Sequence, residues 1–329
     1  RYGMERSVQV KRNRRAVSCL AAALLCAVLL SGCGSEVKER PYSLAERSFS
    51  ASGEEKAETF AADLCVPDGS GDYEDSEITA EAAALFSLED GTVPYYKNMY
   101  EKMYPASITK VMTALVALRH GNLADEVTVT EDAVITESGA SLCNIHPGDR
   151  LTLEQLLYGL MLPSGNDAGA AIAVHIAGSI PAFADMMNEE ALALGATGTH
   201  FTNPHGLTDE DHYTTAYDLY LIFNEAMKEP KFREIVGTSS YYAEYVNGAG
   251  ETVSQTWKMG NQYMTGEQQA PEGVTVTGGK TGTTQAAGYC LLVSSEADDG
   301  GEYISVVMKA DSRPALYGNM TNLMNKIVN

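Results

Sequence analysis

The sequence predicts an α+β fold in which both ends of the chain supply strands to one antiparallel sheet, flanked by helices and interrupted by an inserted helical subdomain. Two strand-like segments, 83–89 and 92–98, precede a long helical middle, and three more, 274–278, 288–295 and 302–309, follow it. Hydrophobic residues make up 44% of the 329 positions and charged residues 20%, which is typical of a chain that buries a sizeable core. The first and last groups of strands are therefore expected to share one sheet.

Turn sequences and a closing helix support this arrangement. Asp90-Gly91 stands between the first two strands and is a strong signal for a two-residue hairpin. The Asp-Asp-Gly-Gly sequence at 298–301 joins the last two strands as a second hairpin. A final helix is expected from four apolar residues that share one helical face, Leu316, Met320, Leu323 and Ile327.

The middle of the chain is predicted to be helical because capping and stop signals recur through it. The stretch 107–118 is apolar on nearly every face, which predicts a buried helix. Thr152 and Gln155 form a capping box that opens a helix at 153–162, and Pro163 ends it. Further helices are expected at 166–177, between Ser179 and Gly195, and at 215–227.

The first 32 residues have the pattern of an export signal. Basic residues between Lys11 and Arg15 precede an apolar run at 16–30, which is shorter than the ~20 residues of a membrane span. The run ends in Leu-Ser-Gly-Cys at 30–33, which resembles a lipobox. We expect a lipoprotein signal peptide at 1–32 and a lipid on Cys33 that anchors an extracytoplasmic protein to the bacterial cell membrane. The alternative is an ordinary signal peptide with an incidental Cys33.

Residues 33–76 differ in composition from the rest of the chain. They are polar and acidic, so a flexible tether that begins at the lipidated Cys33 is expected. Some apolar residues between 60 and 66 leave open the alternative that this segment folds onto the domain. The folded domain is then expected at 77–329.

Charge and metal-ligand spacing exclude two classes of protein. The chain has 23 Lys and Arg against 44 Asp and Glu, a formal net charge of -21, so no nucleic acid partner is expected. The six Cys and six His show no zinc-like or paired ligand spacing, so neither a metal nor another cofactor is expected. Cys143 and Cys290 are interpreted as buried free thiols, with a disulfide between them as the alternative.

A serine and a lysine at the start of the first predicted helix are candidates for nucleophilic catalysis. Ser107 and Lys110 are three residues apart, so they share one helical face, and the serine needs a nearby base to become a nucleophile. Alone this motif is weak, because a capping serine and a solvated lysine would produce it by chance.

Two further motifs lie in a loop and at a strand end, where their side chains could contact a substrate. Ser164-Gly165-Asn166 lies in a short loop between two predicted helices and can present a hydroxyl beside an amide, although a plain helix cap would look the same. The segment from Lys280 to Gly282 ends a predicted strand, where glycines let a substrate backbone approach and the lysine can hold a carboxylate. A simple strand-end turn is the alternative.

The set S-x-x-K, S-x-N and K-T-G, in this order, resembles the penicillin-recognising serine acyltransferases. The flanking sequences narrow the resemblance to low-molecular-weight D-alanyl-D-alanine carboxypeptidases, from about residue 80 to the C-terminus. These sequences are PASITKVMTA at 105–114, PSGND at 163–167, NPHGL at 203–207, HYTTAYDL at 212–219, KTGTT at 280–284 and AGYC at 287–290.

The resemblance implies a serine-type carboxypeptidase that removes the terminal D-Ala from the pentapeptide stem of peptidoglycan and that β-lactams inhibit. Ser107 would form the acyl-enzyme and Lys110 would take its proton. Ser164 would pass a proton to the leaving D-Ala, and Asn166 would bind the substrate amide.

The same resemblance assigns substrate binding to the third motif. Lys280, Thr281 and Gly282 would hold the region of the terminal carboxylate, and the backbone N–H groups of Ser107 and Thr283 would form the oxyanion hole. Position 283 often carries a larger residue in the family, and the segment 238–272 departs from the family pattern, although Asn261 has a counterpart there.

The implied mechanism makes a physical demand on Lys110. The neutral form of a free lysine lies about 4.6 kcal/mol uphill at pH 7. Burial and a nearby positive Lys280 would both lower the pKa of Lys110, so we expect Lys110 to be buried and close to Ser107.

Two other functions remain open. A class A β-lactamase would need a glutamate that activates the deacylating water, and no E-x-x-L-N motif occurs between Ser164 and Lys280. A non-enzymatic β-lactam or muropeptide sensor would use the same fold, normally joined to a transmembrane signalling part.

Overall fold

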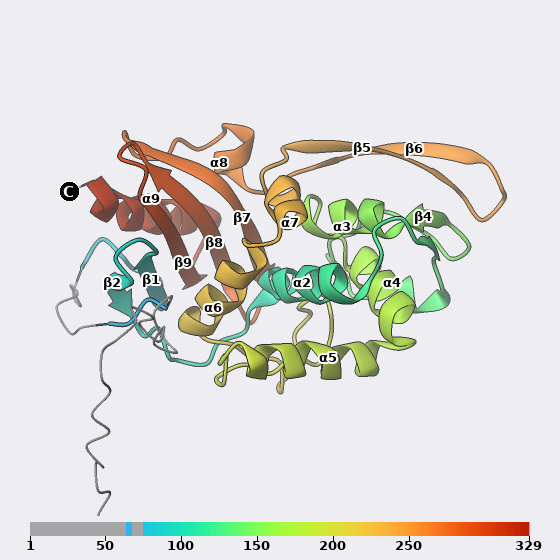
Figure 1. The fold of residues 1–329 in the computed structure, drawn as a ribbon, viewed down its shortest axis with the longest axis horizontal. Coiled ribbons are helices and arrows are strands. Elements are labelled where there is room, and N and C mark those ends of the chain that lie inside the picture. Colours follow the sequence, from blue (N-terminus) through green and yellow to red (C-terminus); the bar gives the residue numbers. More distant parts are fainter. Residues whose placement is uncertain (1–63, 68–74, 329) are drawn as a thin grey trace, which may run out of the picture. The chain divides into compact units, whose positions relative to one another are not determined.

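Five antiparallel strands form the larger sheet, in the order β2-β1-β9-β8-β7 (Figure 1). The computed structural model describes residues 64–67 and 75–328. The strands are β1 (Ala82–Ser87), β2 (Thr92–Lys97), β7 (Val274–Thr284), β8 (Gly288–Ala297) and β9 (Glu302–Ala310). In this sheet Ala84 of β1 lies opposite Tyr96 on one side and Val306 on the other. Strands from the two ends of the chain therefore share one sheet, as predicted.

Strand β1 is buried on both faces because the sheet lies between two layers of helices. All six of its residues are buried. Alternate side chains belong to different clusters, since Ala83 and Leu85 pack with helix α9 (Arg313–Val328) and Phe86 packs with the other helices. The predicted apolar face of α9 is confirmed, because its residues Leu316, Met320 and Leu323 are fully buried against the sheet.

The helices between β2 and β7 form the inserted helical subdomain (Figure 1). They are α2 (Lys110–His120), α3 (Leu153–Met161), α4 (Asn166–Ala177), α5 (Ile180–Ala193), α6 (Ala216–Ala226) and α7 (Pro230–Val236). The capping box is confirmed, because Thr152 Oγ1 accepts from Gln155 N at 3.1 Å and Gln155 Oε1 accepts from Thr152 N at 2.9 Å. The helix expected at 107–118 is instead a 3₁₀ helix, η1 (Ala106–Thr109), followed directly by α2.

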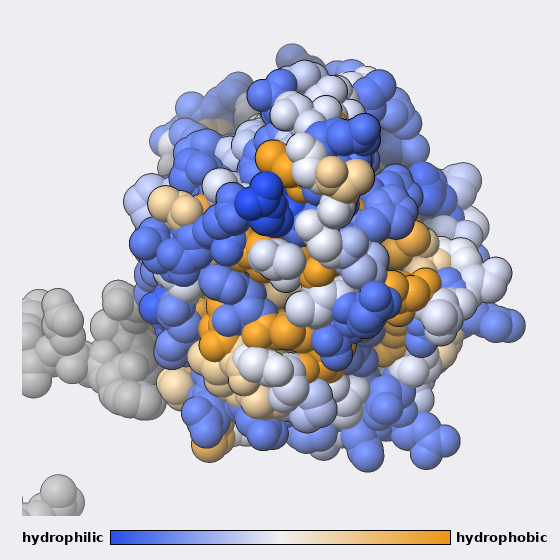
Figure 2. All heavy atoms as spheres, turned by 90° about the vertical axis from the view of Figure 1, so that its right-hand side faces the viewer, coloured by the Kyte–Doolittle hydropathy of each residue, from blue (hydrophilic) through white to orange (hydrophobic). Residues whose placement is uncertain are grey.

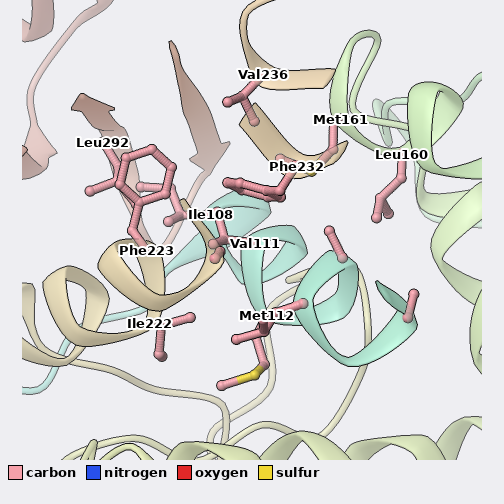
Figure 3. Close-up of a cluster of buried hydrophobic side chains, with 14 of the residues drawn as sticks. Ile108, Val111, Met112, Leu160, Met161, Ile222, Phe223, Phe232, Val236 and Leu292 are labelled. Atoms are coloured by element: carbon pink, nitrogen blue, oxygen red, sulfur yellow. The ribbon is translucent and has the colours of Figure 1, made fainter. Parts of the chain in front are cut away.

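An apolar cluster joins this subdomain to the sheet (Figure 3). Ile108 and Val111 lie at its centre, with Phe223 of α6 and Phe232 of α7 on either side and Leu292 of β8 toward the sheet. Each of these five side chains is at most 1% exposed. The start of α2 is therefore held by helices and sheet together.

A second, four-stranded sheet was not predicted. Its strands are β3 (Glu126–Thr128), β4 (Arg150–Thr152), β5 (Ser240–Val246) and β6 (Thr252–Lys258). The short helix α8 (Gln262–Thr265) follows β6, so the segment 238–272 is a hairpin and one helical turn. On the end of the molecule at the right of Figure 1, where β4 and the β5–β6 turn lie, polar residues predominate and apolar residues appear between them in smaller areas (Figure 2).

Strand β7 has 11 residues, more than twice the length that the sequence predicted. The expected strand 274–278 continues to Thr284, paired with β8 throughout, and its register shifts between Val276 and Gly278. Glycines weaken the strand signal at 278, 279 and 282, but cross-strand pairing maintains the extended backbone. Lys280 to Gly282 therefore lie within the strand rather than beyond its end.

Residues 64–67 pack against the domain, which corrects part of the predicted tether. Cys65 N donates to Tyr220 Oη at 2.8 Å, and Tyr217 Oη donates to Cys65 O at 3.0 Å. The Cys65 side chain is 1% exposed. This part of the segment 33–76 folds onto the domain because Cys65 is buried and Leu64 packs against the core, while Val66 stays exposed. The predicted signal peptide and Cys33 lie outside the described residues.

Among the residues that the structure describes, no single helix is long and apolar enough to cross a membrane. Helices α4 and α5 pass such a test only as a pair, which is bent by 84°.

Candidate active site

Ser107 lies in the 3₁₀ helix that leads into α2, one turn from Lys110. Lys110 Nζ donates to Ser107 Oγ at 2.8 Å. The residue before the serine, Ala106, has a φ of 48°, a conformation that costs a non-glycine residue energy. Gly206 packs so closely that a Cβ there would lie 1.8 Å from Ala106 O. The backbone around Ser107 is therefore held in an unusual conformation by the loop that carries Gly206.

Lys110 is completely buried, and its ammonium group has three oxygen partners. Besides Ser107 Oγ it donates to Asn166 Oδ1 at 2.7 Å and to His205 O at 2.8 Å. Burial lowers the pKa of Lys110 well below its usual value, the charge of Lys280 lowers it further, and Asp167 opposes both effects. The expectation that Lys110 is buried beside Ser107 is confirmed, and a lysine with a lowered pKa can accept a proton from a serine.

Ser164 lies in the tight loop between α3 and α4. Its φ of 66° is left-handed, and the loop is fixed by hydrogen bonds from Gly165 N to Gly159 O at 3.0 Å and from Asn166 N to Ser141 O at 2.8 Å. This geometry presents the Ser164 hydroxyl toward β7, where Lys280 Nζ donates to Ser164 Oγ at 2.9 Å. The two motifs that the sequence singled out separately therefore meet through a hydrogen bond.

Lys280 is 1% exposed, and burial lowers its pKa to about 7. It also donates to Thr281 O at 2.7 Å. Gly282, two residues on, passes directly against η1, because a Cβ there would lie 2.9 Å from Pro105 O and 3.0 Å from Ser107 N. A glycine at 282 is what allows β7 to run beside the candidate nucleophile.

A cavity of about 560 Å³ opens over Ser107. Its volume falls within the ~300–1,000 Å³ that small-molecule sites in proteins occupy. It is lined by Ser107, Glu137, Ser138, Gly139, Ala140, Ser141, Asn166, His205, Gly206, Leu207, Thr208, Thr283, Thr284 and Gln285. Of the residues predicted from the sequence, this wall brings together Ser107, Asn166 and Thr283. Lys110 and Lys280 are buried behind it, and Ser164, Thr281 and Gly282 adjoin it through the contacts above.

The loop 203–207 takes part in the site in a way that sequence reasoning did not assign. Its sequence was noted, but the partner of Lys110 is the backbone carbonyl of His205, which no side-chain pattern reveals. Burial, with the nearby charges of Lys110 and then His212, lowers the pKa of His205 to about 3, so its imidazole is neutral. His212 bridges Thr109 Oγ1 at 2.8 Å and Thr202 N at 3.1 Å, so it braces this loop against the start of α2.

A buried strut connects the β5–β6 hairpin to the active-site loops. Trp257 Nε1 of β6 donates to Cys143 O at 3.0 Å, and Cys143 N donates to the carboxylate of Asp167 at 2.9 Å. Asp167 also accepts from Ile145 N at 3.2 Å and directly follows Asn166. The hairpin therefore positions the loop that carries residues 137–141 of the cavity wall.

Cys143 and Cys290 are both buried and free, as is Cys65, so the interpretation as free thiols is confirmed. In the described part of the chain, no group of three or more His, Cys, Asp or Glu side chains could hold a metal ion.

This geometry, with the antiparallel sheet behind it, places the protein among the active-serine, penicillin-recognising proteins. Comparison with known proteins gives the family. The chain belongs to the D-alanyl-D-alanine carboxypeptidase family, peptidase S11, whose sequence model matches residues 70–312.

Two relatives and one solved structure illustrate the similarity. The chain is 34% identical to D-alanyl-D-alanine carboxypeptidase DacF of Bacillus subtilis over 76% of its own length and 63% of the relative's. It is 35% identical to the D-alanyl-D-alanine carboxypeptidase of Streptomyces sp. K15, over 75% and 87% of the two chains. The crystal structure of the Streptomyces K15 DD-transpeptidase aligns with a TM-score of 0.70 at 32% identity, covering 78% of this chain and 98% of that one.

Proposed function

We propose that this protein is a serine-type D-alanyl-D-alanine carboxypeptidase that removes the terminal D-Ala from the pentapeptide stem of peptidoglycan. The observation that carries the proposal is the 2.8 Å contact between Ser107 Oγ and the fully buried Lys110 Nζ at the base of a cavity. The family and the names of its relatives supply the substrate class.

Acylation uses the two serine–lysine pairs in sequence. Neutral Lys110 accepts the proton of Ser107 as Oγ bonds to the carbonyl carbon of the penultimate D-Ala. The bond from that carbon to the nitrogen of the terminal D-Ala then breaks, and the leaving amine receives a proton through Ser164, which lies against Lys280. The backbone N–H groups of Ser107 and Thr283, which line the same cavity, stabilise the oxyanion.

Deacylation by water completes hydrolysis, whereas attack by an amine would give transpeptidation. The relative from Streptomyces K15 is named a carboxypeptidase, and the solved structure from Streptomyces K15 is named a DD-transpeptidase. Hydrolysis is proposed here because the family model describes a carboxypeptidase. A β-lactam would acylate Ser107 in the same way, and its adduct would persist because no E-x-x-L-N glutamate is present to activate water.

The test measures D-Ala released from a muramyl pentapeptide ending in D-Ala-D-Ala, with and without earlier exposure of the purified protein to penicillin. We expect release that penicillin abolishes, and mass spectrometry should find one adduct, on Ser107. Ser107→Ala should lose both signals, whereas Ser138→Ala, an exposed serine of the same cavity wall, should keep both.

Other outcomes would assign another function. Rapid penicillin turnover without a trapped adduct would indicate a β-lactamase, and a stable adduct without D-Ala release would indicate a sensor. A cross-linked product formed when an acceptor amine is added, in place of hydrolysis, would indicate a transpeptidase.

We also propose that residues 1–32 are a lipoprotein signal peptide and that a lipid on Cys33 anchors the protein outside the cell membrane. The support is the basic cluster, the short apolar run and the Leu-Ser-Gly-Cys sequence. Cys33→Ala should release the protein from membranes or block its processing. A native mature N-terminus without lipid mass would overturn the proposal.

A further inference from the structure

The wall of the active-site cavity carries a single carboxylate. Of the residues that line it, Glu137 alone has an acidic side chain, and the buried His205 is neutral. The two nearby lysines are buried behind the wall. Apart from Glu137, the side chains around the opening are hydroxyls, amides and apolar groups.

The carboxylate of Glu137 has no partner among the residues at 64–67 and 75–328. The residue is exposed, and none of the described cations or hydrogen-bond donors reaches its side chain. Its backbone is nevertheless held in place, because Ala140 N donates to Glu137 O at 3.2 Å and Asn166 N donates to Ser141 O at 2.8 Å. Glu137 is therefore an unpaired negative charge at a fixed point of the wall rather than a member of a surface ion pair.

Strand β7 indicates the direction in which an extended peptide substrate would lie in the cavity. A terminal carboxylate near Lys280 leaves the preceding residues of an extended substrate to run along β7 at about 3.3 Å per residue. The residue before D-Ala-D-Ala then lies about 7 Å further along β7, level with Gly282 and Thr283. Thr283 and Gln285 line the same cavity as Glu137. A side chain at this position that turns into the cavity shares it with the carboxylate of Glu137.

We propose that Glu137 binds an ammonium group on the side chain of the substrate residue that precedes D-Ala-D-Ala. This proposal rests on the proposed carboxypeptidase function and adds a requirement on the substrate. The site thus takes a peptide with a carboxylate at its terminus and a cation on its third residue from the end, the first near Lys280 behind the wall and the second near Glu137 on the wall. Because Glu137 is exposed, the contact contributes a preference of roughly 1.4- to 5-fold in kcat/KM rather than an absolute requirement.

Two tripeptides that differ in one group test this directly. Nα-acetyl-L-Lys-D-Ala-D-Ala keeps the side-chain ammonium, and the Nα,Nε-diacetyl peptide lacks its charge. With the purified full-length protein we expect the first peptide to have the higher kcat/KM, with a preference that declines as salt is added. Glu137→Gln should remove the preference by slowing hydrolysis of the first peptide only. Glu131→Gln, which changes an exposed carboxylate outside the cavity wall on the same segment, should retain it.

The outcomes separate this inference from the function on which it rests. Equal kcat/KM for the two peptides in the wild type, or an equal loss for both in Glu137→Gln, would overturn the role of Glu137. The penicillin adduct on Ser107 and D-Ala release would then remain, and the carboxypeptidase assignment would stand. If neither peptide were hydrolysed and no adduct formed, the proposed function and this inference would both be wrong.

Discussion

Replacing Lys280 with methionine should stabilise the protein while it removes substrate binding. Lys280 is buried, and burial lowers its pKa from 10.5 to about 7. Between these two pH values the unfolded chain binds a proton that the folded protein has released. The unfolding free energy of the wild type therefore rises with pH through this window and falls as pH is lowered toward 7.

The size of the effect follows from the same pKa values. The difference between 10.5 and about 7 corresponds to about 5 kcal/mol of destabilisation when the folded protein holds the charge. Methionine has a similar length and no charge, but it leaves Ser164 Oγ and Thr281 O without their lysine donor, at a cost of about 1–3 kcal/mol. At pH 6, Lys280→Met should thus raise the unfolding free energy by about 2–4 kcal/mol. The substitution also removes the Lys280 charge that lowers the pKa of Lys110, which should raise the unfolding free energy further.

Urea unfolding followed by Trp257 fluorescence at several pH values between 6 and 10.5 measures this difference. The advantage of Lys280→Met should shrink steadily as pH rises and vanish or reverse at pH 10.5. Lys228→Met is the control, because Lys228 is 59% exposed and its replacement should change stability by less than about 1 kcal/mol. A Lys280→Met variant that is less stable than the wild type at pH 6, or a difference that does not change with pH, would refute the reasoning.

Three other changes have defined outcomes. Lys280→Ala should lower kcat/KM roughly 10- to 150-fold for a substrate with a free terminal carboxylate, and Lys280→Arg should lower it less. For an amide-capped substrate, either variant should lower kcat/KM little. An equal loss of kcat/KM for both substrates would mean that Lys280 does not recognise the carboxylate. Gly282→Ala should slow penicillin acylation because the new Cβ would meet Pro105 O at 2.9 Å, whereas Gly318→Ala, with open space around it, should acylate normally. Trp257→Phe should lower the unfolding free energy by about 1–3 kcal/mol, since Cys143 O loses its buried donor. It should also slow acylation in stopped-flow assays. Unchanged acylation would show that the hydrogen bond from Trp257 to Cys143 serves stability alone.

Local signals were sufficient for much of the fold and for the centre of the site. The capping box at Thr152 and the spacing of Ser107 and Lys110 each act within a few residues, so sequence alone specifies them. The five-stranded sheet was predicted because its strands are bounded by turn signals such as Asp90-Gly91, where Gly91 has a φ of 64°. The predicted two-residue hairpin was wrong in its length, because Ser87 pairs with Thr92 and the loop between β1 and β2 has the four residues 88–91.

Features that depend on distant contacts were missed. Strands β3 and β4 have three residues each, too few for any periodicity, and exist because they pair with each other. Gly282 reads as a strand breaker, yet β7 passes through it because of its contact with η1. Glu137 belongs to no motif, and only the folded loop brings it to the cavity wall.

The central place of β1 in the sheet has a consequence for the order in which the protein can be assembled. A ribosome makes β1 and β2 early, but the partner of β1 on its other side, β9, is among the last segments to emerge. The buried hydrogen bond from Ala80 N to Asn319 Oδ1 joins residues 239 positions apart. Until that distance is closed, β1 has only β2 as a strand neighbour, and long-range closure of this kind is slow. A nascent chain stalled or truncated before β9 would therefore expose the unpaired edge of a hydrophobic hairpin. Such intermediates aggregate readily, so this topology makes folding in the cell depend on chaperones.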